Sequence, residues 1–356
     1  MTDSSPKKYR VLVVDDSGFV VAAVSRKLSL DPSIEVVGSA SNGAEALEKI
    51  KALRPDVVTL DVVMPEMDGL TALRHIMSEC PTPVIMLSAL TSENAEATIR
   101  ALELGAVDFF LKPSAISPVG DGNMASSLAA KIKIVARTNR LLTRAGATPA
   151  MRHGAGTAPA EKRSRAEKLV VIGCSTGGPG ALMRLIPALP ADLPAAVLIV
   201  QHMPPMFTKS LADRLNQASN VKVKEAQAES DILQGQALMA PGDHHMLIGQ
   251  NFRIVLNQGP TVHGVRPSVD VTMKSVAQVF GSTAVGVILT GMGADGTDGA
   301  SLIKAAGGKI LAEDESTCAV YGMPKSAVQA GIVDKVVPLG EMASEIVRAC
   351  SQTKHR

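Results

Sequence analysis

The chain has 356 residues, of which 46% are hydrophobic and 20% charged, and its formal net charge is +2. This length and apolar fraction predict two compact domains and exclude a disordered chain or a small disulfide scaffold. Trp is absent and aromatic residues make up only 2% of the chain. That balance disfavours all-β sandwiches and favours parallel sheets covered by helices.

Charge is distributed unevenly along the chain. Residues 1–130 carry 11 Lys or Arg against 17 Asp or Glu, a net charge of −6, whereas residues 131–168 carry ten against two, a net charge of +8. Residues 169–356 carry 15 of each. We therefore predict an acidic domain over 1–130, a final helix and basic linker over 131–168, and a neutral domain over 169–356.

In the first domain, short apolar runs alternate with helical patterns. Strands are expected at 11–14, 35–37, 57–60, 84–87 and 109–111, and helices at 44–53, 95–104 and 125–142. This alternation predicts a doubly wound, flavodoxin-like α/β domain with a parallel sheet.

The second domain has the same rhythm. The stretch from 143 to 168 lacks an apolar face and is expected to be a linker. Strands are then expected at 169–172, 196–200, 284–289 and 309–311, with helices at 207–215 and 269–280. These features predict a second doubly wound parallel sheet, Rossmann-like, and the short segments between 221 and 256 predict a small antiparallel insertion.

Polar residues follow the expected strands of the first domain. Asp15 and Asp16 follow one strand, Asp61 follows another, and Ser88 and Lys112 end two more. The carboxyl ends of parallel strands meet at one edge of the sheet, which is where ligands bind in such folds. Carboxylates brought together repel one another and favour a hard cation, and we predict Mg²⁺.

The motifs VLVVDDS, LDVVMPEMDGL, MLSA and FFLKP make residues 9–130 resemble the receiver domains of two-component response regulators. The resemblance implies that a histidine kinase phosphorylates Asp61, that Asp15, Asp16 and Asp61 bind Mg²⁺, and that Ser88 and Lys112 contact the phosphoryl group. It also implies that Phe109 is the switch aromatic residue and that Pro113 follows a cis peptide bond.

A G-x-S-x-G pattern at 173–177 lies between a strand and a helix of the second domain, which predicts a sharp turn that exposes the Ser175 hydroxyl. A serine nucleophile needs a base and a carboxylate that holds the base. His202 and Asp295 each follow another expected strand, so all three side chains should reach the same sheet edge. From spacing alone, His244, His245 and His263 compete with His202, Asp298 competes with Asp295, and Cys174 is a less suitable nucleophile that we expect to be a buried packing residue.

Residues 169–349 resemble the catalytic domain of the CheB family of chemotaxis protein-glutamate methylesterases. The resemblance is carried by IGCSTGGP, VQHMP, APGDHHM, RPSVD, GVILTGMGADG and AEDESTCAVYGMP. It implies that Ser175 is the nucleophile, His202 the base and Asp295 the orienting carboxylate, with the Met292 N–H as an oxyanion donor. Departures from the family pattern, expected to affect substrate fit more than chemistry, occur at Thr272, Met273, Glu313 and Tyr321.

Together the resemblances imply a phosphorylation-activated serine esterase that hydrolyses glutamate γ-methyl esters, and deamidates glutamine, on methyl-accepting chemotaxis receptors. The ester hydrolysis itself should need no cofactor, and the unphosphorylated receiver should cover the catalytic site. The second half has no net charge and no evident helix-turn-helix, so we expect no nucleic-acid partner. The alternative is a response regulator whose C-terminal domain is a non-catalytic binding or adaptor module.

Two further expectations follow from the composition. The four cysteines, at 80, 174, 318 and 350, form no CxxC pair and are expected to be reduced. No apolar run approaches about 18 residues and the first ten residues are polar, so neither a signal peptide nor a membrane-inserted segment is expected. We therefore predict a cytoplasmic protein.

Overall fold

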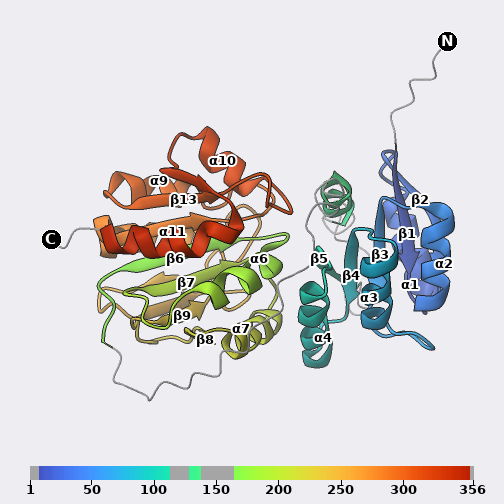
Figure 1. Cartoon of the computed structure of the whole chain (residues 1–356), viewed down its shortest axis with the longest axis horizontal. Coiled ribbons are helices and arrows are strands. Elements are labelled where there is room, and N and C mark those ends of the chain that lie inside the picture. Colours follow the sequence, from blue (N-terminus) through green and yellow to red (C-terminus); the bar gives the residue numbers. More distant parts are fainter. Residues whose placement is uncertain (1–7, 113–127, 138–163, 353–356) are drawn as a thin grey trace, which may run out of the picture. The chain divides into compact units, whose positions relative to one another are not determined.

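The computed structural model describes residues 8–112, 128–137 and 164–352 and divides into two compact units, Met1–Thr148 and Pro149–Arg356 (Figure 1). The Pro113 peptide bond and most of the expected linker lie outside the described residues. Of the helix expected at 125–142, residues 128–137 are described and are helical. The boundaries predicted at 130 and 168 stay predictions.

The first unit contains a five-stranded parallel sheet in the order β2-β1-β3-β4-β5, which confirms the flavodoxin-like prediction. Its strands are β1 (Tyr9–Val14), β2 (Ile34–Ala40), β3 (Val57–Asp61), β4 (Val84–Ser88) and β5 (Asp108–Leu111). Its helices include α1 (Gly18–Leu28), α2 (Gly43–Leu53), α3 (Gly69–Glu79) and α4 (Ser92–Glu103).

Local sequence explains where these helices begin. Ser17, Asn42, Asp68 and Thr91 each precede a helix and accept a backbone N–H of its first turn. Strands β3 and β4 are buried along their whole length, as expected for parallel strands covered on both faces. Because the strands are parallel and each is followed by a helix that runs back, the residues that follow the strands lie at one edge of the sheet.

The second unit contains a seven-stranded parallel sheet in the order β14-β13-β12-β6-β7-β9-β8. Its strands are β6 (Leu169–Cys174), β7 (Ala196–Gln201), β8 (Lys222–Glu225), β9 (Gln236–Met239), β12 (Ala284–Ile288), β13 (Lys309–Glu313) and β14 (Lys335–Val337). Its α-helices are α6 (Gly178–Leu185), α7 (Phe207–Ala218), α8 (Val269–Phe280), α9 (Thr297–Ala305), α10 (Met323–Gln329) and α11 (Leu339–Gln352). Two 3₁₀ turns, η1 (Ile186–Ala188) and η2 (Gly281–Thr283), complete the described elements.

The expected antiparallel insertion is smaller than predicted. Strands β10 (His245–Ile248) and β11 (Ile254–Asn257) form an antiparallel hairpin, as expected. The prediction is wrong for β8 and β9, which pair parallel to each other and extend the main sheet beyond β7. Short strands bounded by turns look alike in sequence whether they form an antiparallel hairpin or add in parallel to the edge of a larger sheet.

No helix within the described ranges is both long enough and apolar enough to cross a membrane.

Candidate functional site

In the first unit, the predicted acidic residues and Lys112 meet at the carboxyl edge of the sheet. Asp15 follows β1 and Asp61 ends β3, and both are buried. Lys112 follows β5, and its Nζ lies 2.8 Å from Asp15 Oδ2 and 2.8 Å from Asp61 Oδ2. Asp16 is exposed beside them. The structure therefore brings these four residues together as the sequence predicted.

The charges at this edge are unbalanced. Asp15, Asp16 and Asp61 each place a carboxylate oxygen within 4.8 Å of the other two, and Lys112 pairs with Asp15 and Asp61. Burial raises the pKa of Asp61 despite the attraction of Lys112. Burial acts to lower the pKa of Lys112, but its bonds to the two carboxylates raise it.

This donor set fits a magnesium ion. All three ligands are hard carboxylate oxygens, the kind that Mg²⁺ prefers. Asp15 Oδ2 is buried and has an ion pair with Lys112 but no hydrogen bond of ordinary geometry. A divalent cation would therefore offset the excess negative charge and give this oxygen a further partner.

Ser88 ends β4 as predicted, and Phe109 lies near the start of the neighbouring strand β5, paired with Met86. The Ser88 hydroxyl is buried, accepts a hydrogen bond from Thr98 Oγ1 of α4 at 2.9 Å, and donates to the Ala89 carbonyl at 3.3 Å. Phe109 is buried, with 7% of its surface exposed. Both side chains are thus packed within the first unit.

In the second unit, Ser175 follows β6 on the predicted turn. Its N–H donates to the Thr290 carbonyl at 3.0 Å, and its carbonyl accepts from the Gly178 N–H at 2.8 Å and from Gln201 Nε2 at 3.0 Å. Its side chain is partly exposed and has no hydrogen bond to any described residue. The backbone of the nucleophile candidate is therefore fixed while its hydroxyl is free to react.

Glycines make this turn possible. Gly177 adopts a left-handed φ of +79°, and a Cβ there would lie 2.4 Å from the Cβ of Ala319. A Cβ on Gly291 would lie 2.9 Å from the Cβ of Ser175 and 2.3 Å from the sulfur of Met323. Side chains at either position would displace the turn that presents Ser175.

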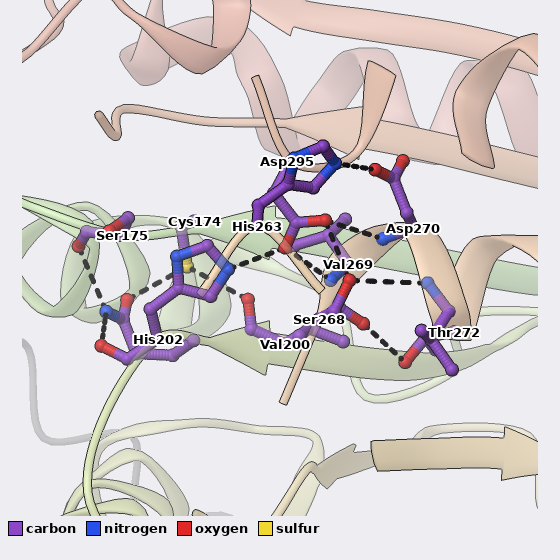
Figure 2. Close-up of polar contacts among 12 residues, drawn as sticks. Cys174, Ser175, Val200, His202, His263, Ser268, Val269, Asp270, Thr272 and Asp295 are labelled. Atoms are coloured by element: carbon purple, nitrogen blue, oxygen red, sulfur yellow. Dashed lines mark hydrogen bonds and ion pairs between the residues drawn. The ribbon is translucent and has the colours of Figure 1, made fainter. Parts of the chain in front are cut away.

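His202 and Asp295 are in direct contact (Figure 2). His202 Nε2 lies 2.7 Å from Asp295 Oδ2. Asp295 also accepts the Ser268 hydroxyl at 2.8 Å and the backbone N–H groups of Val269 at 2.7 Å and Asp270 at 3.0 Å. Burial alone would raise the pKa of Asp295, but these hydrogen bonds lower it to about 2. The carboxylate is therefore ionised throughout the neutral range.

Strand register explains why Ser175 and His202 share one edge. Cys174 pairs with Gln201 at the ends of β6 and β7, and the His202 N–H donates to the Cys174 carbonyl at 3.1 Å. Because Nε2 of His202 is bonded to Asp295, Nδ1 is the nitrogen left to accept a proton. Figure 2 shows Nδ1 on the side of the ring toward Cys174 and Ser175.

The competing candidates have other contacts. His244 Nδ1 lies 3.2 Å from the Gly242 carbonyl, His245 lies 3.0 Å from the Pro260 carbonyl, and His263 pairs with Asp270 at 3.0 Å. Asp298 is exposed in the first turn of α9. Cys174 is fully buried, its Sγ donates to Gln201 Oε1 at 3.1 Å, and burial raises the pKa of its thiol. The expectation that Cys174 is a packing residue is confirmed.

Met292 lies two residues beyond Thr290, the residue that accepts the Ser175 N–H. Its side chain is 44% exposed. Its backbone N–H has no acceptor among the residues with described positions. The N–H that is expected to donate to the oxyanion therefore has no hydrogen-bond acceptor among the described residues, and its loop packs against Ser175.

Three residues around the triad candidates make contacts that the sequence did not indicate. Ser268 and Gln201 hydrogen-bond Asp295 and Ser175, respectively, and Glu313 bonds the backbone of Thr290. The available signal was the position of Ser268 as the N-cap of α8, within RPSVD. Glu313, Thr272 and Met273 are fully buried, and the expectation that these departures affect substrate fit stays a prediction. Tyr321 is partly exposed.

Comparison with known proteins identifies a family domain in each unit. Residues 170–346 match the CheB methylesterase family model, and residues 11–119 match the response regulator receiver domain model. A protein-glutamate methylesterase/protein-glutamine glutaminase of Symbiobacterium thermophilum is 49% identical over 370 residues, covering 99% of this chain and 100% of that protein. A protein of the same name from Archaeoglobus fulgidus is 49% identical over 342 residues, covering 95% of this chain and 97% of that protein.

Among solved structures, the Thermotoga maritima CheB methylesterase catalytic domain is 45% identical, with a TM-score of 0.50. The match covers 51% of this chain and 97% of that chain. The chain therefore belongs to the CheB family of protein-glutamate methylesterases/protein-glutamine glutaminases, in which a receiver domain precedes the methylesterase domain.

Proposed function

We propose that Ser175, His202 and Asp295 are the nucleophile, general base and orienting carboxylate of a protein-glutamate methylesterase that also deamidates glutamine. The observation that carries the proposal is the 2.7 Å contact between His202 Nε2 and the ionised Asp295, at the sheet edge where Ser175 emerges. The relatives named for both activities align over nearly the whole chain. They give no support to the alternative of a non-catalytic adaptor.

The proposed reaction begins when His202 Nδ1 takes the proton of Ser175 and Oγ attacks the γ-carbonyl carbon of a methylated glutamate. The Met292 N–H donates to the oxyanion, a contact worth about 3 kcal/mol in comparable sites. His202 then protonates the methoxide, methanol leaves, and water hydrolyses the acyl enzyme with His202 again acting as base. With a glutamine substrate, ammonia leaves instead of methanol.

We propose that the chain is organised as a receiver over 1–130, a helix and linker over 131–168, and a catalytic domain over 169–356. Within the receiver, Asp61 accepts a phosphoryl group from a histidine kinase, and Ser88 and Lys112 contact that group. Asp15, Asp16 and Asp61 would hold Mg²⁺, which would supply positive charge for phosphoryl transfer. The added phosphoryl charge shifts the receiver between two states and thereby regulates the esterase.

The proposed substrates are methyl-accepting chemotaxis receptors, and the proposed location is the cytoplasm. Family membership supports chemoreceptor glutamates as the substrate class and a histidine kinase as the phosphodonor. The proposal predicts that the protein acts on the cytoplasmic, methylated segments of such receptors.

Methanol release from methylated receptor fragments tests the proposal. Wild type, Ser175→Ala and the control Ser344→Ala, an exposed serine of α11, are compared with and without Mg²⁺ and a small phosphodonor. We expect Ser175→Ala to lose nearly all release and the control to lose none. Equal release by wild type and Ser175→Ala would disprove the enzymatic assignment. A rate of methanol release that is the same with and without the phosphodonor would disprove the proposed regulation by phosphorylation.

A further inference from the structure

Glu313 is a buried carboxylate with no part in the mechanism above. It ends β13, and its side chain is fully buried. Oε2 accepts the Thr290 N–H at 2.8 Å, and Oε1 accepts the Thr317 hydroxyl at 3.0 Å. Burial raises the pKa of this carboxyl group. A carboxylate removed from water is costly unless its hydrogen bonds offset the loss, so these two contacts need an explanation.

The Thr290 peptide links Glu313 to the nucleophile. The parallel ladder between β12 and β13 reaches Ile288 and Ala312, and the chain turns away after β13. Beyond this point the backbone of β13 offers no acceptor to the Thr290 N–H, and the Glu313 carboxylate accepts it instead. On the opposite side of Thr290, its carbonyl accepts the Ser175 N–H at 3.0 Å. Glu313 and Ser175 therefore bond the same residue from two directions.

Thr290 also fixes the loop that carries the oxyanion donor. Its hydroxyl donates to the Thr176 carbonyl at 2.9 Å and accepts the Val320 N–H at 2.9 Å. The next residue, Gly291, donates its N–H to the Val320 carbonyl at 3.0 Å. Met292 follows directly. A shift of Thr290 would thus move the nucleophile and the Met292 N–H together.

We propose that Glu313 is a positioning residue of the esterase: by accepting the Thr290 N–H, it fixes Ser175 relative to the Met292 N–H. This inference rests on the proposed function of Ser175. Glu313 does not contact the substrate, since it is buried behind the turn. It acts on the transition state through Thr290 and should therefore affect kcat more than KM.

The surroundings of Glu313 define which substitutions preserve this role. Cys174 and Cys318 lie close enough to feel its charge, and Arg184 contributes a weaker attraction. A glutamine could accept the Thr290 N–H through its carbonyl oxygen and donate to Thr317, whose hydroxyl also lies 3.3 Å from the Asp314 carbonyl. Leucine has a similar volume but no acceptor, so it would leave the Thr290 N–H buried and unpaired.

Steady-state methanol release in the full-length protein tests the inference. For Glu313→Leu we expect a fall in kcat of about 10- to 100-fold with KM changed less than about threefold, because small misplacements of reacting groups are costly. Glu313→Gln should stay within about threefold of wild type in kcat. Thr317→Val is the matched control: it removes the other hydrogen bond of Glu313 but keeps the bond to Thr290, so kcat should be unchanged even where stability falls.

Labelling of Ser175 by a fluorophosphonate probe provides a second readout, since it reports the reactivity of the nucleophile without the receptor substrate. The labelling rate should fall with kcat in Glu313→Leu and recover in Glu313→Gln. If Glu313→Leu does not fold, as judged by circular dichroism, Glu313→Ala replaces it, because alanine likewise offers no acceptor to the Thr290 N–H. The inference would be overturned if a folded variant that lacks the Thr290 contact kept the wild-type kcat and labelling rate. It would also be overturned if kcat fell equally in Glu313→Leu and Glu313→Gln. Neither result would touch the assignment of Ser175, which the Ser175→Ala comparison tests separately.

Discussion

Replacing Asp295 with asparagine should disrupt the hydrogen bonds through which Asp295 orients the His202 imidazole. Each carboxylate oxygen accepts two hydrogen bonds: Oδ2 from His202 and the Val269 N–H, and Oδ1 from the Ser268 hydroxyl and the Asp270 N–H. An asparagine amide has one acceptor oxygen. In either orientation its NH₂ group must face a backbone N–H, which cannot turn into an acceptor.

The size of the effect follows from these contacts. Hydrogen bonds to charged groups contribute about 1.5–3 kcal/mol each, and the variant loses at least one of them to Asp295. The pKa of Asp295 is about 2 instead of its ordinary 3.8, which corresponds to about 2 kcal/mol of preference for the ionised form. We expect the unfolding free energy to fall by about 2–3 kcal/mol. We expect kcat to fall about 10⁴-fold, as when the orienting carboxylate of a serine hydrolase is replaced.

Two assays check this prediction, methanol release at neutral pH and urea unfolding at a series of acidic pH values. Because the folded pKa of Asp295 lies below the unfolded one, its contribution to stability is complete above about pH 4 and is lost as the pH falls toward 2. The stability difference between wild type and Asp295→Asn should therefore shrink over that range. A kcat within tenfold of wild type, or a stability difference independent of pH, would refute the reasoning.

Three further predictions concern the turn, the receiver and the helix cap. Gly177→Ala should lower the unfolding free energy by more than about 2 kcal/mol and impair methanol release. The new methyl group would lie 2.4 Å from the Cβ of Ala319, and alanine is strained in the left-handed backbone conformation of this position. Calorimetry and the esterase assay check this prediction. Lys112→Met should abolish activation by a small phosphodonor while leaving phosphodonor-independent release unchanged, since Lys112 is the cation paired with Asp61; Lys51→Met, an exposed lysine on α2, is the control. Ser268→Ala should lower kcat about tenfold and stability by about 1 kcal/mol, because a hydrogen bond to Asp295 and the cap of α8 are lost together; an unchanged kcat would contradict it.

The sequence predicted the parts of the fold that depend on local pattern. Apolar runs identified the strands of both main sheets except β8, β9 and β14, and the helix over Val269–Phe280 was predicted with its observed bounds. The pairing of β8 and β9 was missed because their parallel arrangement depends on contacts with β7, not on the strands themselves.

The candidate triad was predictable for a different reason. Ser175, His202 and Asp295 each follow a strand, and β7, β6 and β12 are neighbours in the sheet, so adjacency converts chain position into proximity. Spacing alone could not choose between His202 and His263, which faces Asp270 in a similar pair. Ser268 could be recognised from its N-cap position within RPSVD, but the contacts that it and Glu313 make could not be predicted, because they depend on where a helix begins and where a strand turns away in three dimensions.

The two acidic centres of this chain are neutralised by different means. Asp61 faces the ammonium group of Lys112, whose side chain is 20% exposed, whereas Asp295 is surrounded by main-chain dipoles and a hydroxyl that are part of the start of α8. Dissolved ions screen the first kind of interaction more effectively than the second, because buried peptide groups are out of their reach. The electrostatic environment of His202 is thus set by the path of the backbone. We expect changes in ionic strength to affect it less than they affect phosphoryl transfer at Asp61.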